Sequence, residues 1–429
     1  MIKNTIGYSY NDLTIIPEVI SNINSRSECD PFIKDIFLPI FTAPMASVVN
    51  EENYETFLDN GITPIIPRNI SLEVRKKLMN DQQWVALSLK EFEDLFINNY
   101  LDRIGDFRTY YFICVDIANG HMKSLYDKCA KAKNLAKDNN YKLIIMTGNI
   151  ANAKTYEWIY KNALCEFEEN GYKYYDCAID YIRVGIGGGS GCITTSNVSI
   201  HYPQASLINE CKKIKESIIC NKYIRKKPAI VADGGIRNYD HVIKALALGA
   251  DYVMIGSLFA QCIESAGEKT NKKNNQKISL RFPIERYKDF SVDSKGNFKA
   301  YYTDEYIKEA SKTWEEDLVN SSNKQLAQLS YNRRIDDLKQ EKIIGGIDVK
   351  FFGMASADGQ KSINGKKTKT AEGITKWLPV KYTLKGWTEN MISYLRSAMS
   401  YCNCKDIIEF IGKPDLIVNS ISEIYAVNK

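Results

Sequence analysis

Eight short apolar runs, each ended by small or polar residues, constrain the fold of this chain more than any other feature. Most of the runs are followed by a stretch with helical periodicity, such as 124–137, 204–215 and 240–248. Runs of this length that are apolar on both faces and alternate with helices are typical of buried parallel strands. Eight such units predict a closed (β/α)8 TIM barrel of the α/β class. The runs span 38–44, 61–67, 84–89, 110–117, 142–150, 181–187, 228–235 and 250–257.

Charge and hydropathy exclude two classes of partner. The formal net charge of +5 over 429 residues suits a protein that meets phosphorylated ligands, but it is too small to indicate nucleic-acid binding. The N-terminus lacks the apolar core of a signal peptide, and no run approaches the length of a membrane span. We therefore expect no nucleic acid and no membrane among the partners. We also expect a cytoplasmic location with reduced thiols.

The pattern changes after the eighth run. A stretch rich in lysine and asparagine, 268–276, leads into a charged segment of which 304–340 is helix-like. We expect one barrel domain over 1–429 that carries an insertion at 267–345. A solvated surface elaboration, an oligomer contact and an active-site cover remain open as its role. The stretch 387–401 is expected to form a final amphipathic barrel helix.

The residues that close the strands matter most, because barrel enzymes place their chemistry at the carboxyl ends of the strands. The sixth run ends in Gly-Ile-Gly-Gly-Gly-Ser-Gly-Cys-Ile-Thr-Thr at 185–195. Its glycines allow tight turns that expose amides and carbonyls, which suits an anion cradle or a carbonyl-lined cation site. Cys192 lies in this loop and is a candidate nucleophile. The alternative is that it is an inert small hydrophobe, as most single cysteines are.

A second candidate site residue closes the seventh run, in Val-Ala-Asp-Gly-Gly-Ile-Arg at 231–237. The carboxylate of Asp233 can accept hydrogen bonds from ribose hydroxyls while the following glycines let the backbone approach the sugar. Loops after the seventh and eighth strands of barrels commonly bind phosphate. The alternative is that Asp233 is a helix N-cap or a turn residue.

Together these segments resemble the family of inosine monophosphate dehydrogenase and guanosine monophosphate reductase. The resemblance covers nearly all of 6–265 and 346–420 and leaves the insertion unmatched. It rests on motifs at 185–194, 202–204, 232–237, 254–260, 351–356, 371–373 and 395–401.

Two departures from the dehydrogenases favour the reductase branch. The dehydrogenases usually carry tandem regulatory nucleotide-binding modules after the second βα unit, whereas Pro67 here leads to Trp84 without room for them. They also place an Arg-Tyr pair before the residue that matches Glu372, and 361–372 contains none. The resemblance thus implies NADPH-dependent reductive deamination of guanosine monophosphate to inosine monophosphate and ammonia, with NADH left open. The alternatives are NAD-dependent oxidation of inosine monophosphate to xanthosine monophosphate, and a catalytically inactive barrel that binds purine nucleotides.

The resemblance also implies roles for individual residues. The Cys192 thiolate would attack C2 of the purine nucleoside monophosphate, while Thr194 and Glu372 relay a proton to the leaving ammonia. The glycines at 188 and 191 depart from the family pattern and are expected to loosen the catalytic loop. A homotetramer is expected. The implied substrate-binding residues are Ser190, Asp233, Gly235, Gly256, Ser257, Gly353, Met354, Asn149 and Arg68. The implied cofactor-binding residues are Asp116, Asn119 and Gly120, and the implied potassium ligands are the carbonyls of Gly187, Gly189 and Cys192.

Overall fold

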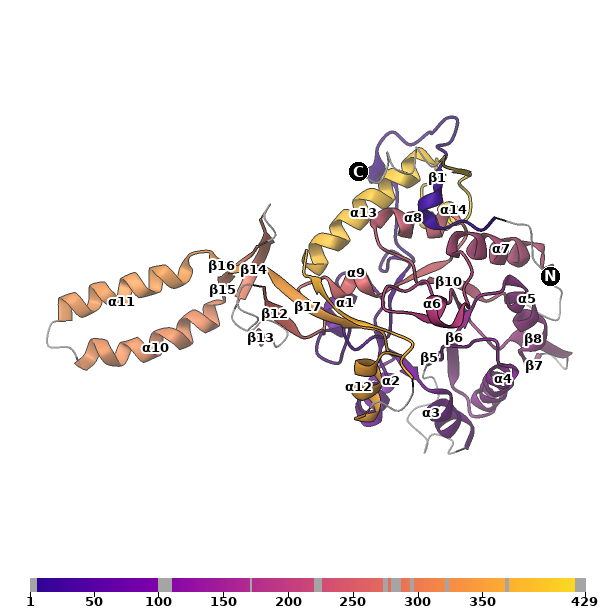
Figure 1. The fold of residues 1–429 in the computed structure, drawn as a ribbon, viewed down its shortest axis with the longest axis horizontal. Coiled ribbons are helices and arrows are strands. Elements are labelled where there is room, and N and C mark those ends of the chain that lie inside the picture. The colour runs from indigo at the N-terminus through magenta and orange to yellow at the C-terminus, as the bar shows by residue number, and fades with distance from the viewer. Residues whose placement is uncertain are drawn as a thin grey trace.

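The computed structural model describes most of the chain as a barrel with a long projecting arm (Figure 1). The described residues are 6–98, 110–169, 172–219, 226–272, 277–278, 287–293, 297–320, 324–366 and 370–420.

Eight parallel strands form one sheet in the order β2-β11-β10-β9-β6-β5-β4-β3. The strands at the two ends of this order meet, because Phe41 of β2 forms a parallel bridge with Thr63, just before β3. The predicted (β/α)8 barrel is therefore confirmed. Each strand falls within a predicted apolar run: β2 Ile40–Thr42, β3 Ile65–Ile66, β4 Trp84–Leu87, β5 Tyr110–Asp116, β6 Lys142–Ile150, β9 Tyr181–Val184, β10 Ala229–Asp233 and β11 Tyr252–Ile255.

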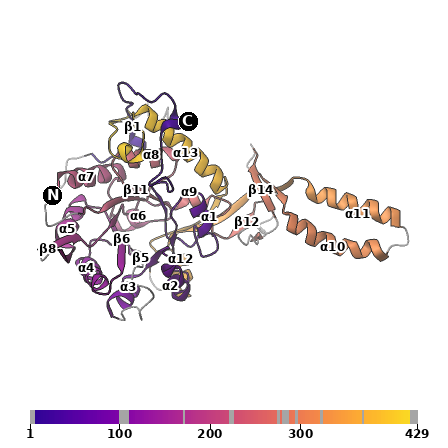
Figure 2. The same ribbon diagram turned by 180° about the vertical axis from the view of Figure 1, so that it is seen from behind.

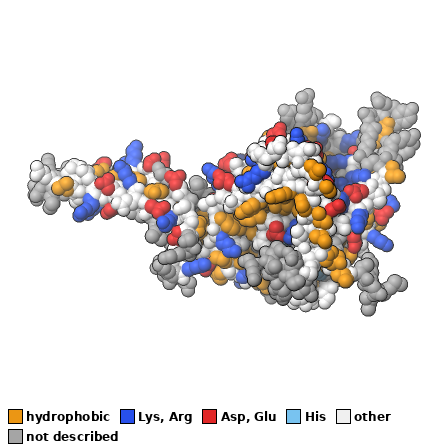
Figure 3. Space-filling model, turned by 90° about the horizontal axis from the view of Figure 1, so that it is seen from above, with side chains coloured by type: hydrophobic (Ala, Val, Ile, Leu, Met, Phe, Trp, Pro, Cys, Tyr) orange, Lys and Arg blue, Asp and Glu red, His pale blue; other side chains and the backbone are white. Residues whose placement is uncertain are grey.

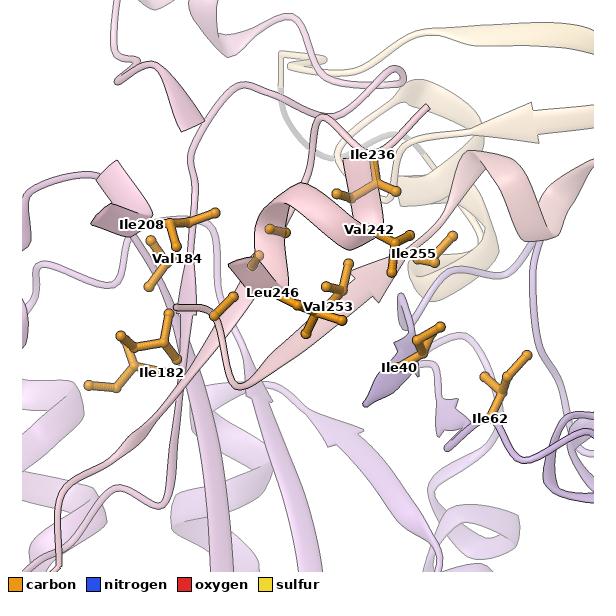
Figure 4. Packing of buried hydrophobic residues seen from close by; sticks show 14 of the residues in the cluster. Ile40, Ile62, Ile182, Val184, Ile208, Ile236, Val242, Leu246, Val253 and Ile255 are labelled. Atoms are coloured by element: carbon orange, nitrogen blue, oxygen red, sulfur yellow. The ribbon is translucent and has the colours of Figure 1, made fainter. Parts of the chain in front are cut away.

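The strands are apolar throughout because both of their faces are buried. Along β4, Trp84 and Ala86 pack inside the barrel, whereas Val85 and Leu87 pack outward against the helices. The interior is filled by aromatic side chains, with Trp84 and Tyr181 in an edge-to-face contact at 5.4 Å. Figure 4 shows the outer layer, where β9, β10 and β11 pack against helices of the ring.

The helices of the ring follow the strands along the chain, and only α2 lies between β3 and β4. The segment expected as the final barrel helix forms α13, whose Trp387 stacks on Tyr239 at the start of α8 with ring centroids 5.4 Å apart. The longer helices of the barrel are α2 Leu72–Asn80, α4 Lys123–Asp138, α5 Ala153–Asn162, α7 Gln204–Ser217, α8 Tyr239–Ala247, α12 Ala357–Asn364 and α13 Leu384–Tyr401. The shorter ones are α1 Tyr54–Asp59, α3 Leu89–Glu93 with a π-turn at Asp94–Asn98, α6 Thr194–Val198, α9 Ser257–Ala260 and α14 Ile407–Phe410.

Two small antiparallel pairs elaborate the barrel. A hairpin of β7, Leu164–Glu169, and β8, Tyr172–Cys177, lies between α5 and β9 and was absent from the predicted strands. Near the termini, β1, Leu13–Ile15, pairs with β19, Leu416–Val418. Two short 3-10 helices, Tyr10–Asp12 and Arg26–Glu28, complete the N-terminal segment.

The predicted insertion contributes to two sheets and a helical hairpin. The helix-like stretch 304–340 forms two antiparallel helices that project far from the barrel (Figures 1 and 2). Lys, Arg, Asp and Glu side chains are interspersed along them (Figure 3). No helix in the described part of the chain is both long and apolar enough to span a membrane. One sheet contains β12 Lys269–Asn271, β13 Lys277–Ile278, β17 Ile347–Phe352 and β18 Thr375–Pro379. The other contains β14 Tyr287–Val292, β15 Phe298–Tyr302 and β16 Lys342–Gly345, followed outward by α10 Asp304–Asn320 and α11 Lys324–Lys339.

A buried pair of titratable residues lies where the arm joins the barrel. The Lys269 ammonium donates to the carbonyls of Ser265 and Gly267, and the Glu264 carboxylate accepts from the Leu384 N–H at the start of α13. Burial raises the pKa of Glu264 to about 7 and lowers the pKa of Lys269 to about 8. The charge state of this joint is therefore expected to change near neutral pH.

Candidate active site

A cavity of about 230 Å³ opens at the carboxyl ends of the barrel strands. Its walls come from the loops after β2, β9, β10 and β11, from the end of β17 and from the segment before β18. Most of the residues predicted for the site meet there. Those that line the cavity are Asp116, Gly189, Ser190, Cys192, Asp233, Gly235, Gly256, Ser257, Gly353, Met354 and Glu372.

Three predicted catalytic side chains form one continuous hydrogen-bonded line. The Cys192 thiol donates to the Thr194 hydroxyl at 3.1 Å, and that hydroxyl donates to a carboxylate oxygen of Glu372 at 3.3 Å. Cys192 is partly exposed and is the one cysteine among the described residues that lines the cavity. A proton can pass along this line between the cavity and the carboxylate without any other protein group.

Backbone pairing holds the two loops of this line together. The Ile193 N–H donates to the Glu372 carbonyl at 3.1 Å, and the Ile374 N–H donates to the Gly191 carbonyl at 2.9 Å. Cys192 and Gly373 form an antiparallel bridge between them. The thiol and the carboxylate are thus positioned by main-chain contacts, although 180 residues separate them in the sequence.

The two unusual glycines of the catalytic loop have different roles. A Cβ on Gly191 would lie 3.0 Å from the Gly353 nitrogen, so a side chain there would require Gly353 to move by a few tenths of an ångström. A Cβ on Gly188 would meet its nearest neighbour at 3.5 Å, an ordinary contact, and its backbone is not in the left-handed region. An alanine could therefore be accommodated at Gly188, whereas at Gly191 it would require Gly353 to move; the expected loosening of the loop stays a prediction.

An arginine that the sequence analysis did not single out connects the two aspartates of the cavity. Arg183 of β9 donates from Nη1 to Asp116 at 2.7 Å and from Nη2 and Nε to Asp233 at 2.9 and 3.0 Å. Asn149 donates to the same oxygen of Asp233 at 2.7 Å. The two carboxylates hold the pKa of Arg183 well above its usual value despite its burial. The guanidinium therefore keeps its charge and fixes the orientation of both carboxylates.

A second thiol lies beneath this ion-pair network. Cys114 of β5 is fully buried, and burial raises its pKa to about 12 even though Arg183 Nη1 lies 3.7 Å from its sulfur. Such a thiol stays protonated and inert. The contrast leaves Cys192 as the nucleophile candidate of the cavity.

One end of the cavity is suited to an anion. The Ser190 hydroxyl is buried without a hydrogen-bond partner among the described residues, which leaves it free for a ligand. Gly235 lines the same cavity with φ of +78°, and the His241 ring lies 3.0 Å from its carbonyl oxygen. Gly256 and Ser257, at the start of α9, also line the cavity.

Several residues predicted for the site do not line the cavity. Arg68 lies behind Asp116 and donates to its carbonyl at 3.2 Å, and Asn149 supports Asp233. Asn119 is exposed, and its side chain accepts from the His121 N–H at 3.0 Å. A Cβ on Gly120 would lie 2.7 Å from the Asn149 carbonyl oxygen, so this glycine serves the packing of two loops. Of the three predicted cofactor contacts, Asp116 alone reaches the cavity.

The predicted potassium ligands are engaged within their own loop. The Gly187 carbonyl accepts from the Thr195 hydroxyl at 3.0 Å, and the Gly189 carbonyl accepts from the Cys192 N–H at 3.0 Å. A cation site needs several carbonyl oxygens directed at one point. A carbonyl oxygen that accepts one hydrogen bond keeps a second lone pair, so the carbonyls of Gly187 and Gly189 remain able to bind a cation.

A thiol, a hydroxyl and a carboxylate lie in line at the carboxyl ends of the barrel strands. Enzymes with this fold place their catalytic residues at the same position. A model of the IMP dehydrogenase / GMP reductase domain matches residues 108–281. The chain is also similar to GMP reductase of Helicobacter pylori strain 26695, with 31% identity over 272 residues that cover 61% of this chain and 73% of the relative.

Two further GMP reductases agree with this match. The protein of Streptococcus agalactiae serotype V is 29% identical over 64% of this chain and 77% of its own length. The protein of Staphylococcus aureus strain JH9 is 29% identical over 63% of this chain and 76% of its own length. The chain belongs to the IMP dehydrogenase / GMP reductase family of oxidoreductases.

Proposed function

We propose that this protein catalyses the NADPH-dependent reductive deamination of guanosine monophosphate to inosine monophosphate and ammonia. The observation that supports this reaction best is the line from Cys192 through Thr194 to Glu372. It joins a nucleophile to a proton relay and ends on a carboxylate, and it requires no base to activate water. The names of the similar proteins support the same reaction.

In the proposed reaction the Cys192 sulfur adds to C2 of the purine, and its proton moves through Thr194 to Glu372. The same relay then returns a proton to the 2-amino group, which leaves as ammonia and gives a thioimidate. Covalent catalysis of this kind divides one difficult displacement into two easier steps. Reduced nicotinamide supplies a hydride to C2 when bound, and the thiolate then leaves.

The remaining cavity residues bind and orient the nucleotide. Asp233 accepts hydrogen bonds from the ribose hydroxyls in its fixed orientation, and Ser190 donates its unpaired hydroxyl to the phosphate. Gly353 and Met354 lie beside the base. Asp116 faces the nicotinamide side.

The decisive experiment is a spectrophotometric assay that supplies guanosine monophosphate with NADPH, and then with NADH, and follows cofactor oxidation and ammonia together. One ammonia per oxidised cofactor is expected. Cofactor reduction with inosine monophosphate instead would identify a dehydrogenase. Nucleotide binding without either reaction would identify an inactive barrel and would refute the proposal.

Two variants test the roles within the site. Cys192→Ala is expected to bind guanosine monophosphate and to lose turnover, so substantial residual rate would exclude the covalent mechanism. Glu372→Gln is expected to lose deamination while retaining hydride exchange between cofactor and inosine monophosphate. Equal loss of both activities would indicate a structural role for the carboxylate.

The quaternary structure and the cation belong to the same proposal. We expect a homotetramer. Size-exclusion chromatography with light scattering would measure the mass of the assembly. Turnover is expected to depend on potassium, which the carbonyls of Gly187, Gly189 and Cys192 would bind. Replacing potassium by sodium in the assay tests that expectation.

A further inference from the structure

One cationic side chain lines the cavity and a second lies against a residue of the cavity wall, and neither had a predicted role. Arg237 lines the cavity just after the Gly234-Gly235 turn, and its side chain is exposed. Its backbone is held in place, because the Arg237 N–H donates to the His241 ring at 3.2 Å. The guanidinium therefore projects from a fixed point of the loop after β10.

The second cation is on β18, beside the cavity residue Phe351. Lys376 of β18 pairs with Phe351 of β17, and its ammonium lies 5.7 Å from the centre of the Phe351 ring, which itself lines the cavity. Burial lowers the pKa of Lys376, and the charge of Arg237 lowers it further. Arg237 and Phe351 both line the cavity, and Lys376 lies against Phe351, so the two cations border the same opening.

Neither cation has a carboxylate partner among the described residues. Asp358 of α12 contacts the same two strands, but it is engaged by the Thr375 hydroxyl at 2.7 Å and the Lys350 ammonium at 3.2 Å. Two adjacent and unpaired cations at the mouth of a nucleotide pocket are stabilised by an anion that lies between them.

These two cations lie at a different place from the part of the cavity that is suited to an anion, which we call the inner end. The inner end is formed by the buried Ser190 hydroxyl and the turn at Gly235, which suit one phosphate. Arg237 is exposed and therefore lies toward the solvent from that end. A second phosphate joined to the first would extend outward toward it.

We propose that Arg237 and Lys376 form an outer anion subsite that binds the β-phosphate of guanosine diphosphate, so that this nucleotide occupies the pocket and inhibits the enzyme competitively. The inference rests on the proposed function for its assumption that guanosine binds in the inner cavity. A nucleoside monophosphate has no group that reaches the outer subsite. The subsite would thus let the enzyme sense a more highly phosphorylated form of its own substrate.

The test is calorimetric titration of the full-length protein with guanosine monophosphate and with guanosine diphosphate. The variants are Arg237→Gln, Lys376→Gln and the double variant, and the control is Lys385→Gln, which removes an exposed lysine of α13. In the double variant we expect a roughly tenfold loss of affinity for the diphosphate and a change of less than about threefold for the monophosphate. The inhibition constant of the diphosphate in the turnover assay should rise by the same factor.

Three results would overturn the inference. The first is an equal loss for both nucleotides, which would place the cations on the first phosphate. The second is unchanged affinity for the diphosphate in the double variant, and the third is no binding of the diphosphate to the unaltered protein. Titration requires no turnover, so binding without reaction would reject the proposed activity while leaving the outer subsite intact.

Discussion

Replacement of Arg183 by methionine tests whether the buried guanidinium positions the two aspartates of the cavity. The Arg183 side chain is 9% exposed, and the side chains of Asp116 and Asp233 are 17% and 14% exposed. Removing one partner of a buried ion pair costs about 3–5 kcal/mol, because the other charge stays buried without compensation. Since both carboxylates retain some contact with solvent, we expect the lower end, about 3 kcal/mol of unfolding free energy.

The same substitution should weaken nucleotide binding for a separate reason. Without its two bonds from Arg183, the Asp233 carboxylate can turn away from the position in which it meets the ribose. A hydrogen bond to a charged group contributes about 1.5–3 kcal/mol, so loss of the bond between Asp233 and the ribose is expected to weaken binding roughly 10- to 100-fold. The measurements are urea unfolding, for the stability, and calorimetric titration with guanosine monophosphate, for the affinity.

A matched control separates the two effects. Arg75 is equally buried, with a side-chain exposure of 3%, and pairs with Glu91 at 2.6 Å, but it does not line the cavity. Arg75→Met should therefore cost similar stability and leave nucleotide affinity unchanged, while Arg183→Lys should retain part of both. If Arg75→Met and Arg183→Met weakened binding equally, or if Arg183→Met left stability intact, the positioning argument would be refuted.

Three further predictions concern the joint, the catalytic loop and the arm. Folding raises the pKa of Glu264 from 4.5 to about 7, so the free energy of unfolding should fall by up to about 3 kcal/mol as pH rises through that range. Urea unfolding at several pH values measures this trend, and Glu264→Gln should abolish it. Gly188→Ala should leave the free energy of unfolding unchanged or raise it by up to about 1 kcal/mol. Gly191→Ala should displace Gly353 and reduce turnover. Similar turnover kinetics for both variants would contradict the contact geometry. Replacing 303–340 by a short turn between the paired strands β15 and β16 should change barrel stability by about 1 kcal/mol or less and preserve nucleotide affinity, which unfolding and titration would check.

The barrel could be predicted because its strands are buried on both faces and therefore read as continuous apolar runs. The hairpin β7–β8 was missed although Asn-Gly at 170–171, between two alternating segments, is a strong hairpin signal. Its strands contain charged and tyrosine residues, so they lack the apolar character by which the barrel strands were found.

Within the site, the motifs predicted which residues meet but not how each one acts. Arg183 was overlooked because it lies inside an otherwise apolar strand. A buried charge needs an oppositely charged or hydrogen-bonding partner, and that requirement could have identified Arg183 as a site residue. Asn119 and Gly120 were expected at the cofactor side, yet the turn of their loop directs Asn119 to solvent and packs Gly120 on Asn149. Such turns depend on contacts between loops distant in sequence, which local patterns do not encode.

The arm leaves the fold between β15 and β16, at a point where the chain already reverses direction, and its two helices lie far from the catalytic loops (Figure 1). Substitutions on α10 and α11 therefore escape the constraints that fix Gly191, Arg183 and Glu372. A change on the surface of these helices leaves the contacts among Cys192, Thr194 and Glu372 unaltered.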